Sequence, residues 1–296
     1  MTPHETAALV ALLGIGRRPP SHYSELVESD ASAVAVLERE LAQHDYGQVL
    51  LPVTPNADEL IERAAADLAS WKAEGMTTVT VLGPNFPINL RAVHDRPPLL
   101  FVAGRLDPRR DQRSVAVIGS RRASNEGLKL ANAVAGHLAE HGFTVVSGLA
   151  AGIDTAAHTT ALALGARTIA VIGTGLEQAY PAANAALQSK IASVGAVVSQ
   201  FWPDAGPTRT SFPMRNAVMS GLSLATVIVE ASQTSGARVQ ARLAQRQGRP
   251  VFISRTLLDQ AWARVLASQP GVHVFGDPAE ITPVLERLTS SDALVA

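Results

Sequence analysis

Short apolar runs and amphipathic segments alternate along most of the chain. From residue 76 onward, runs rich in Val, Ile, Leu and Ala recur as "TTVTVLG", "PPLLFVAG", "SVAVIG", "FTVVSG", "RTIAVIG", "AVVS", "ATVIVEA" and "PVFIS". Runs that are apolar on both faces and separated by helices predict a parallel sheet covered on both sides. We therefore expect an α/β fold with an extended Rossmann-like, doubly wound, mostly parallel sheet. The intervening amphipathic segments predict helices over residues 125–140, 154–164, 184–194 and 236–247.

The start of the chain follows a different pattern, which predicts short helices. Apolar residues recur at helical spacing from Pro3 onward, and this pattern ends at Gly14 and Gly16. A second helix is expected to begin at Ser29 or Asp30. The apolar face of that second helix is expected to carry Val34, Leu37 and Leu41.

We divide the chain into a small helical domain over residues 1–52, SAM- or helix-hairpin-like, and a Rossmann-like domain over residues 53–296. A helix of about five turns is expected to open the second domain and to end at Gly75. The stretch "LLGIG" has two interpretations that the sequence leaves open. It is either part of a helical mini-core or a hairpin turn of the kind that contacts a DNA backbone.

Ligands of doubly wound sheets bind at the carboxyl ends of the strands, so the residues that follow each strand are the candidates. Three of these segments are glycine- and serine-rich and lead into helix N-termini, which offer free N–H groups to an anion. Arg121 adds a guanidinium suited to phosphate, although such turns also serve simply to reverse the chain. The phosphate-binding candidates are Gly119, Ser120 and Arg121 after one strand, Ser147 and Gly148 after the next, and Ser235 and Gly236 further on.

A fourth segment, "QFWPDAGPTRTSFPMRN", combines cations with aromatic rings. Guanidinium groups suit the backbone of single-stranded nucleic acid, and a ring face suits an unstacked base. The alternative, a core phenylalanine beside solvated arginines, is equally compatible with the sequence alone. The candidates here are Arg209, Phe212, Arg215 and Asn216, with Phe201 and Trp202 just upstream.

Composition narrows the class of function. The net charge is only −1, so a nucleic-acid site has to be a local basic patch. The absence of cysteine excludes disulfides, thiolate metal sites and cysteine nucleophiles. No apolar run is long enough to span a bilayer, and we expect a cytoplasmic protein that does not bind membranes.

The motifs of catalysis are missing. There is no P-loop, no H-E-x-x-H and no clustered set of metal ligands, and "GTGLEQ" is a degraded dinucleotide fingerprint. Asp154 and His158 share a helix face and could bind a metal, but a helix-capping aspartate near a histidine is the preferred interpretation. Glu230 could act as a general base, yet nothing in the sequence gives it a partner. We expect a site that binds without reacting, with no cofactor and no metal.

Six ordered motifs resemble those of the DNA-processing protein A (DprA, also Smf) family. They are "VAVIGSR", "TVVSGLAAGIDTAAH", "ALALGARTIAVIGTGLEQAYPAAN", "FPMRNAVMSGLS", "VIVEASQTSGA" and "QGRPVF", and the resemblance covers roughly residues 76 to 290. It implies a non-enzymatic mediator of recombination that binds single-stranded DNA in a positive pocket. It also implies a homodimer, and loading of the recombinase RecA during natural transformation.

The resemblance also implies roles for individual residues. The Gly119, Ser120 and Arg121 loop would hold a DNA phosphate, Arg209 would supply a basic contact, and Phe212 would lie against a base. Arg215 and Asn216 match the family's Arg-Asn pair, and Ser235 and Gly236 match its Ser-Gly anion loop.

The chain departs from the family pattern at several places. Ala151 and Ala217 stand where the family usually has arginine, and the loss of two phosphate contacts weakens a DNA pocket. "ISRTLLDQAWARVL" replaces the usual segment after the last recognised strand, and we expect the family's winged helix to be missing after residue 290. These differences suggest a divergent branch, attached to a defence or mobile-element system.

A second hypothesis is a Rossmann-like nucleotide sensor or nucleotide hydrolase. Nucleoside-monophosphate hydrolases of this kind carry a "PGGxGTxxE" loop, and "EASQTSGARVQAR" lacks both its double glycine and its glutamate. Assembly is also open, because the segment after "PVFIS" has an apolar face that either covers the sheet or forms an interface, and the resemblance favours the interface. That face carries Leu257, Leu258, Ala261, Trp262, Val265 and Leu266.

Overall fold

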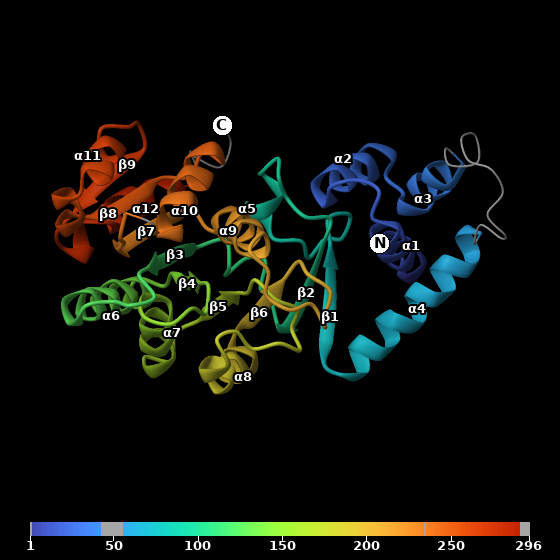
Figure 1. The fold of residues 1–296 in the computed structure, drawn as a ribbon, viewed down its shortest axis with the longest axis horizontal. Coiled ribbons are helices and arrows are strands. Elements are labelled where there is room, and N and C mark those ends of the chain that lie inside the picture. The colour runs from blue at the N-terminus through green and yellow to red at the C-terminus, as the bar shows by residue number, and fades with distance from the viewer. Residues whose placement is uncertain (1, 43–55, 234, 291–296) are drawn as a thin grey trace.

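The core of the protein is one nine-stranded sheet with the strand order β1-β2-β6-β5-β4-β3-β7-β8-β9, which confirms the predicted fold class (Figure 1). The computed structural model describes residues 2–42, 56–233 and 235–290. The strands are β1 (Met76–Thr80), β2 (Leu99–Gly104), β3 (Ser114–Gly119), β4 (Thr144–Ser147), β5 (Thr168–Val171), β6 (Ala196–Ser199), β7 (Ala225–Glu230), β8 (Val251–Ser254) and β9 (Val272–Phe275).

All neighbouring strands from β6 to β9 are parallel, whereas β1 and β2 form an antiparallel extension at one edge. The chain builds outward from β3 to β6 in one direction and then returns to place β7 on the other side of β3. Strand order therefore reverses between β3 and β7, where Val117 pairs with Val227. Ligands of doubly wound sheets bind at the carboxyl side of this reversal.

Helices cover both faces of the sheet, as its apolar strands require. Alternating residues of β3 face opposite layers, because Val115 and Val117 pack with the α6 and α7 side while Ala116 and Ile118 pack with the other. One layer consists of α6 (Asn125–Glu140), α7 (Ile153–Ala163) and α8 (Ala185–Val194), and the opposite layer of α9 (Ser211–Leu222), α10 (Gly236–Arg246) and α11 (Ala261–Ala267) (Figure 1).

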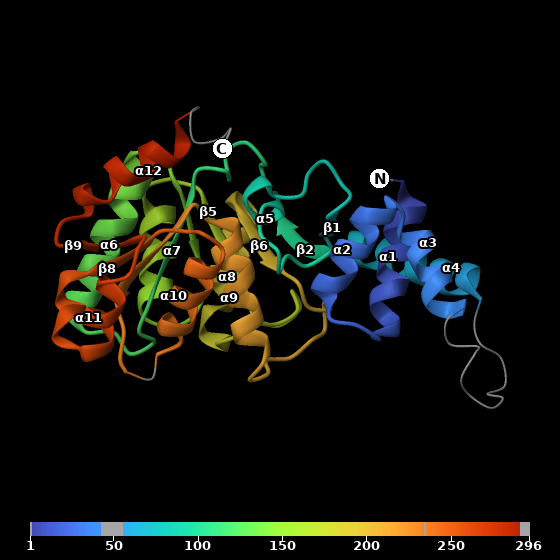
Figure 2. The ribbon, with the colours of Figure 1, turned by 90° about the horizontal axis from the view of Figure 1, so that it is seen from above.

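The helical part lies at one end of the molecule, next to β1 and β2 (Figures 1 and 2). The rings of Trp71, Phe101 and Trp202 contact one another and join α4 to the sheet and to the loop after β6. The helix α4 packs on α1 and α3 as well as on β1, so it bridges the two parts. The expected boundary at residue 52 lies outside the described residues. The helices here are α1 (Pro3–Ile15), α2 (Pro20–Asp30), α3 (Ala33–Ala42) and α4 (Ala57–Ala73), and the short α5 (Ile88–Arg91) precedes β2.

One expectation for the helical part needs correction. Ser29 and Asp30 are not an N-cap but the end of α2, and α3 begins at Ala33, whose N–H donates to the carboxylate of Glu5 at 2.6 Å. The carboxylate from another helix thus adds to a local cap, Ser32, whose Oγ accepts from the N–H of Ala35 at 3.2 Å.

The stretch "LLGIG" completes α1, and Gly16 ends the helix in the left-handed conformation at φ 61°. The next two residues, Arg17 and Arg18, both donate to Glu40, so their guanidinium groups are engaged within the protein. These contacts favour the interpretation of this stretch as part of a helical mini-core.

The carboxyl-terminal elements also differ from expectation. The segment expected as one amphipathic helix is a 3-10 turn, Arg255–Asp259, followed by the short α11. Trp262 and Leu266 are buried, but Ala261 is exposed and Val265 has 63% of its surface exposed, because the break at Gln260 turns the second piece. The sequence analysis missed β9 and α12 (Thr282–Thr289).

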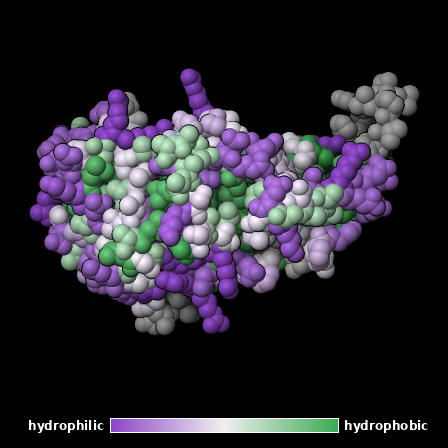
Figure 3. Space-filling view, turned by 90° about the horizontal axis from the view of Figure 1, so that it is seen from below, coloured by the Kyte–Doolittle hydropathy of each residue, from purple (hydrophilic) through white to green (hydrophobic). Residues whose placement is uncertain are grey.

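Large exposed apolar side chains are scattered across the surface of the described residues, with Val265, Leu164 and Val194 among the most exposed. On the face shown in Figure 3, hydrophobic residues form small areas between hydrophilic ones. Within the part of the chain that the structure describes, no helix combines the length and apolar character needed to cross a membrane.

Candidate nucleic-acid interface

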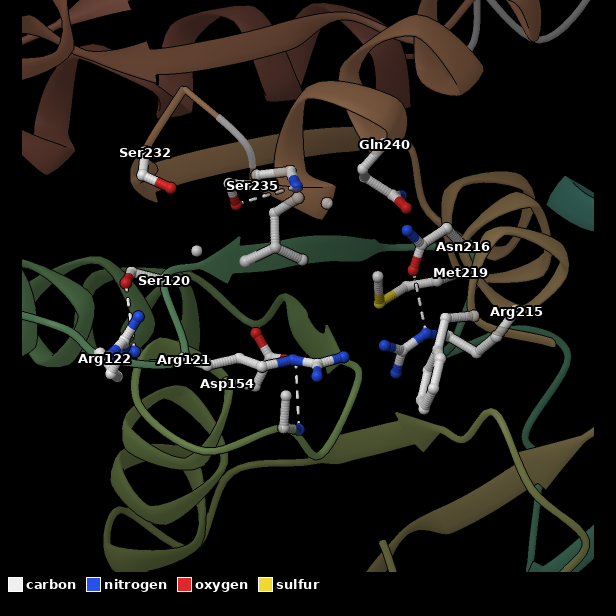
Figure 4. A pocket seen from close by; sticks show the side chains of 16 residues that line it. Ser120, Arg121, Arg122, Asp154, Arg215, Asn216, Met219, Ser232, Ser235 and Gln240 are labelled. Atoms are coloured by element: carbon white, nitrogen blue, oxygen red, sulfur yellow. Dashed lines mark hydrogen bonds between the residues drawn. The ribbon is translucent and has the colours of Figure 1, made fainter. Parts of the chain in front are cut away.

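A pocket of about 440 Å³ lies where the strand order reverses, at the carboxyl ends of β3 and β7 (Figure 4). Its walls come from the loop after β3, the start of α7, the first turns of α9 and the start of α10. Its lining includes Ile118, Gly119, Ser120, Arg121, Arg122, Ala150, Asp154, Phe212, Arg215, Asn216, Met219, Ser232, Ser235, Gly236, Ala237 and Gln240.

The loop after β3 presents its cation to the pocket. Gly119 is required there, because a Cβ atom would lie 2.6 Å from the side chain of Ile153 and 2.7 Å from the carbonyl oxygen of Glu230. The guanidinium of Arg121 is exposed and lies 5.1 Å from the centroid of the Phe212 ring. No carboxylate among the described residues forms an ion pair with Arg121, so this charge is available to a ligand.

The neighbouring helix N-terminus is closed by the protein itself. The carboxylate of Glu230 accepts from the backbone N–H of Ser124 at 3.1 Å and also from its hydroxyl, while the Ser124 Oγ accepts from the N–H of Gly127. The start of α6 is therefore already neutralised by an internal anion. Glu230 is a capping residue in this structure, and the partner that the sequence could not supply for it is Ser124.

The loop after β4 is closed in a similar way. The buried carboxylate of Asp154 accepts from the N–H groups of Gly148 at 3.2 Å and Ala150 at 3.3 Å. Burial raises the pKa of Asp154, against the opposing effects of Arg215 and of these N–H donors. The residue lies in the first turn of α7 and satisfies the loop that precedes it, so this loop has little to offer an external phosphate.

The structure therefore gives Ser147 a supporting role rather than the predicted contact with phosphate. Ser147 is fully buried, and its hydroxyl is already engaged because it donates to the carbonyl oxygen of Val117 at 2.6 Å. The N–H of Gly148 is taken by Asp154, and its carbonyl oxygen accepts from Arg215. Gly148 nevertheless lines a second pocket that adjoins the first.

Arg215 lies at the base of the pocket and is 6% exposed. It donates to the carbonyl oxygens of Gly148 and Val171, the latter at 2.7 Å, and its Nε donates to Asn216 Oδ1 at 3.0 Å. Burial lowers the pKa of this guanidinium, and the nearby Asp154 opposes that effect. A Cβ atom at Gly148 would lie 2.0 Å from Arg215 Nη1, which explains the glycine.

The fourth segment is partly a helix rather than a loop. Phe212, Arg215 and Asn216 lie at i, i+3 and i+4 in the first turns of α9, so they share one face, and that face lines the pocket. Arg209 is exposed on the loop before α9 and lies outside the described pocket linings.

An adjoining pocket of about 380 Å³ extends the site past Phe212 and shares Arg121, Ala150, Phe212 and Arg215 with the first. Tyr180 belongs to it, is 45% exposed, and has its ring centroid 5.6 Å from that of Phe212. The sequence analysis did not single out Tyr180, although it stands in a strand-end segment. A row of Tyr180, Phe212 and Arg121 results, in which two aromatic rings lie beside a cation that forms no ion pair within the described residues.

The start of α10 is the open helix N-terminus of the pocket. Ser235 is its N-cap and accepts from the N–H of Ala237 at 3.2 Å, and Gly236 lines the pocket beside it. Gln240 follows one turn further along and is fully buried at the pocket wall. Among the described residues, no carboxylate caps this helix as Glu230 caps α6.

His158 lies behind the pocket and is fully buried. Its Nδ1 lies 2.7 Å from Thr168 Oγ1, whose own hydrogen is donated to Val145, so Nδ1 carries the ring proton. Burial lowers the pKa of His158 to about 3. No three His, Asp or Glu side chains within the described residues gather closely enough to hold a metal ion.

These features define a class: a doubly wound, Rossmann-like protein with a cationic and aromatic pocket at its topological switch point. The sequence profile of the family described as "DNA recombination-mediator protein A" matches residues 77–269, more than half of the chain. The chain belongs to this family.

Among curated relatives, the chain is similar to "DNA processing protein DprA" of Streptococcus pneumoniae, with 42% identity over 61% of this chain and 64% of that protein. It is also similar to "Protein Smf" of Synechocystis, with 40% identity over 57% of this chain and 43% of that protein. The chain thus spans less than two thirds of the length of either relative.

Solved structures extend the similarity. The S. pneumoniae DprA structure superposes with a TM-score of 0.69 at 29% identity, covering 96% of this chain and 98% of that one. A structure of DNA processing protein A from Helicobacter pylori, described by its single-stranded DNA binding mode, superposes with a TM-score of 0.62 at 28% identity. It covers 72% of this chain and 96% of that one.

Proposed function

We propose that this protein binds single-stranded DNA in the pocket at the ends of β3 and β7 and acts as a mediator of recombination. The observation that carries the proposal is Arg121. Its guanidinium is exposed, lacks an ion-pair partner among the described residues, and lies 5.1 Å from the ring centroid of Phe212. A guanidinium that lacks a carboxylate partner and lies over an aromatic ring suits a phosphate, and the neighbouring rings of Phe212 and Tyr180 suit an unstacked base.

The comparisons support the nucleic acid over other anions. The H. pylori protein, whose fold this chain shares, is described by its binding of single-stranded DNA. Phe212 and Tyr180 offer ring faces, which duplex DNA cannot use because its bases are stacked and paired. Phosphate contacts from Arg121 and the start of α10 predict that affinity falls steeply with salt.

Titration of the purified protein with a labelled single strand and with its duplex, at low and moderate salt, tests the proposal. We expect the single strand to bind more tightly, with little dependence on sequence and with a linear fall of log affinity against log salt. Equal binding of duplex, or no DNA binding at low salt, would refute it.

We also propose that the site binds without catalysis. Glu230 is the residue that the sequence analysis considered as a general base. In the structure its carboxylate accepts hydrogen bonds from Ser124, at the start of α6. Incubation with nucleoside mono- and triphosphates in the presence of magnesium should release neither base nor phosphate. Release that a Glu230→Gln variant abolishes would favour the nucleotide hydrolase instead.

The family relationship leads us to propose three further properties: loading of RecA onto the bound strand, action in the cytoplasm, and a homodimer. Two linked pockets would raise avidity for one strand without new contacts. Val265, 63% exposed on α11, is an apolar side chain that a partner chain could contact there. Light scattering at micromolar concentration should report about twice the 31.0 kDa chain mass, and a monomer with or without DNA would exclude the dimer.

A further inference from the structure

Gln240 is buried at the wall of the pocket with an amide that nothing in the described protein satisfies. It is fully buried, and neither Oε1 nor Nε2 has a hydrogen-bond partner among the described residues. Figure 4 shows its amide directed from α10 toward Asn216 across the pocket. A buried polar group without a partner is costly, so a ligand that supplies one donor and one acceptor would be favoured there.

The surroundings of Gln240 narrow the chemistry of that ligand. Ile118, Ala237 and Met219 supply buried apolar walls in the same pocket. Asn216 Oδ1 accepts from Arg215, and Figure 4 shows the amide nitrogen of Asn216 directed into the pocket. The space therefore suits a flat group with apolar faces and a polar edge that carries a donor and an acceptor side by side.

A nucleobase has this form. The pairing edge of every base offers a donor next to an acceptor, and a glutamine amide matches either order by turning over. Gln240 can therefore hold a base without selecting strongly among bases. In a duplex the same edge is occupied by the complementary base.

The position of Gln240 along α10 is consistent with a nucleotide. Ser235 and Gly236 form the open helix N-terminus at the same pocket, and Gln240 lies four residues further on, about one helical turn deeper. A phosphate held near Arg121 and the start of α10 would leave its base directed toward Gln240.

We infer that one unstacked nucleobase of the bound strand enters this pocket and is hydrogen-bonded at its edge by Gln240. The inference rests on the proposed function and names the part of the strand that the site recognises. It assigns Gln240 to the base and Arg121 to the phosphate.

Two changes, one in the protein and one in the oligomer, separate binding of the base from binding of the phosphate. The wild type and Gln240→Met are titrated with an oligothymidylate and with an oligomer of equal length and charge made of abasic units. Methionine keeps the volume of the side chain and removes its hydrogen bonds. Gln245→Met on the same helix, which lines a different pocket, is the matched control.

We expect Gln240→Met to weaken binding of the oligothymidylate about five- to tenfold, as the loss of one or two hydrogen bonds predicts, and to leave abasic binding unchanged. Thermal melting of Gln240→Met should equal or exceed that of the wild type, because an unpaired buried amide is removed. Gln245→Met should bind both oligomers as the wild type does.

Other outcomes are distinguishable. If Gln240→Met weakens the binding of both oligomers equally, the residue acts through the fold. If the wild type binds the abasic oligomer as tightly as the oligothymidylate, no base enters the pocket. Either result overturns the inference but leaves phosphate binding intact. Thymidine monophosphate that displaces the oligomer at concentrations below the oligomer's own dissociation constant would assign the pocket to a free nucleotide. Failure of both oligomers to bind the wild type would refute the proposed function itself.

Discussion

Two turns at the same edge of the sheet have similar sequences, but one is open to a ligand and the other is closed by hydrogen bonds within the protein. The turn after β3, with Gly119 and Ser120, leaves Arg121 exposed and without an ion-pair partner in the described part of the protein. In the turn after β4, the N–H groups of Gly148 and Ala150 are bonded to Asp154, and the carbonyl oxygen of Gly148 accepts from Arg215. Both resemble phosphate-binding loops in sequence, but only the first is open.

The difference depends on residues that lie outside the turns. Asp154 closes the second turn from the start of α7, and Arg215 closes it from α9, 67 residues further along the chain. Glu230 closes the start of α6 in the same way from β7. A glycine- and serine-rich turn is thus a site for an external anion only where the fold brings no internal anion to it.

The largest expected effect comes from opening the closed turn. Arg215→Met leaves the carbonyl oxygens of Gly148 and Val171 without their donor and removes a cation near buried Asp154, so we expect a loss of about 3–5 kcal/mol in unfolding free energy. Chemical denaturation measures this change. Arg122→Met, on the exposed turn, is the control and should unfold like the wild type; an equally stable Arg215→Met would show that the second turn is not held by this residue.

The complementary variant acts on binding rather than on stability. Arg121→Ala should weaken single-strand binding by about 1.5–3 kcal/mol, roughly 10- to 150-fold, because a charged hydrogen bond to phosphate is lost. Arg121→Lys should recover only part of the affinity, because lysine keeps the charge but lacks the planar guanidinium that binds phosphate through two hydrogen bonds. Fluorescence anisotropy measures both.

The control for this comparison is Arg110→Ala, an exposed arginine before β3, at the opposite edge of the sheet. It should bind DNA like the wild type. If Arg121→Ala folds normally and binds as tightly as Arg110→Ala, the turn after β3 does not hold the strand.

We expect a smaller effect of pH on the unfolding free energy, and it arises from buried His158, behind the closed turn. Burial lowers the pKa of His158 from 6.5 to about 3, so below pH 6.5 the unfolded chain binds a proton that the folded chain does not. This contribution to stability is present above pH 6.5 and is lost as pH falls toward 3. Between pH 6.5 and 5 it amounts to about 1.5 kcal/mol.

Asp154 acts in the opposite sense, because its raised pKa makes its contribution fall as pH rises above 3.8. The effect of His158 is therefore measured as a difference between the wild type and His158→Gln in denaturation at each pH. The variant should lose less stability on acidification. Parallel curves for the two proteins would remove His158 from the pH dependence.

The sequence predicted the sheet well because its signals are local. The strands β3 to β8 are continuous apolar runs, and the helix expected over residues 125–140 is α6, Asn125–Glu140. The prediction was weaker where long-range contacts decide. Ser29 and Asp30 were misassigned because α3 begins later, at Ala33, where Ser32 and the distant Glu5 of α1 together cap it.

Long-range contacts also limited the prediction of the site. Arg121, Phe212, Arg215 and Asn216 were identified by residue type, and the structure brings all four to one pocket. Sequence could not show that Arg215 is committed to two carbonyl oxygens, because its acceptors come from β5 and from the turn after β4. Gln240 carried no sequence signal, since an amide inside a helix shows its lack of partners only in three dimensions.

Hydrogen exchange with and without a single-stranded oligonucleotide tests the contrast between the open and closed turns most directly. The account predicts slower exchange on DNA binding in peptides that cover residues 119–123 and 235–240, which line the open pocket. Peptides that cover residues 147–152 should exchange equally in both states, because the N–H groups of Gly148 and Ala150 are already bonded to Asp154. Slower exchange confined to residues 147–152, with none at residues 119–123, would contradict the account.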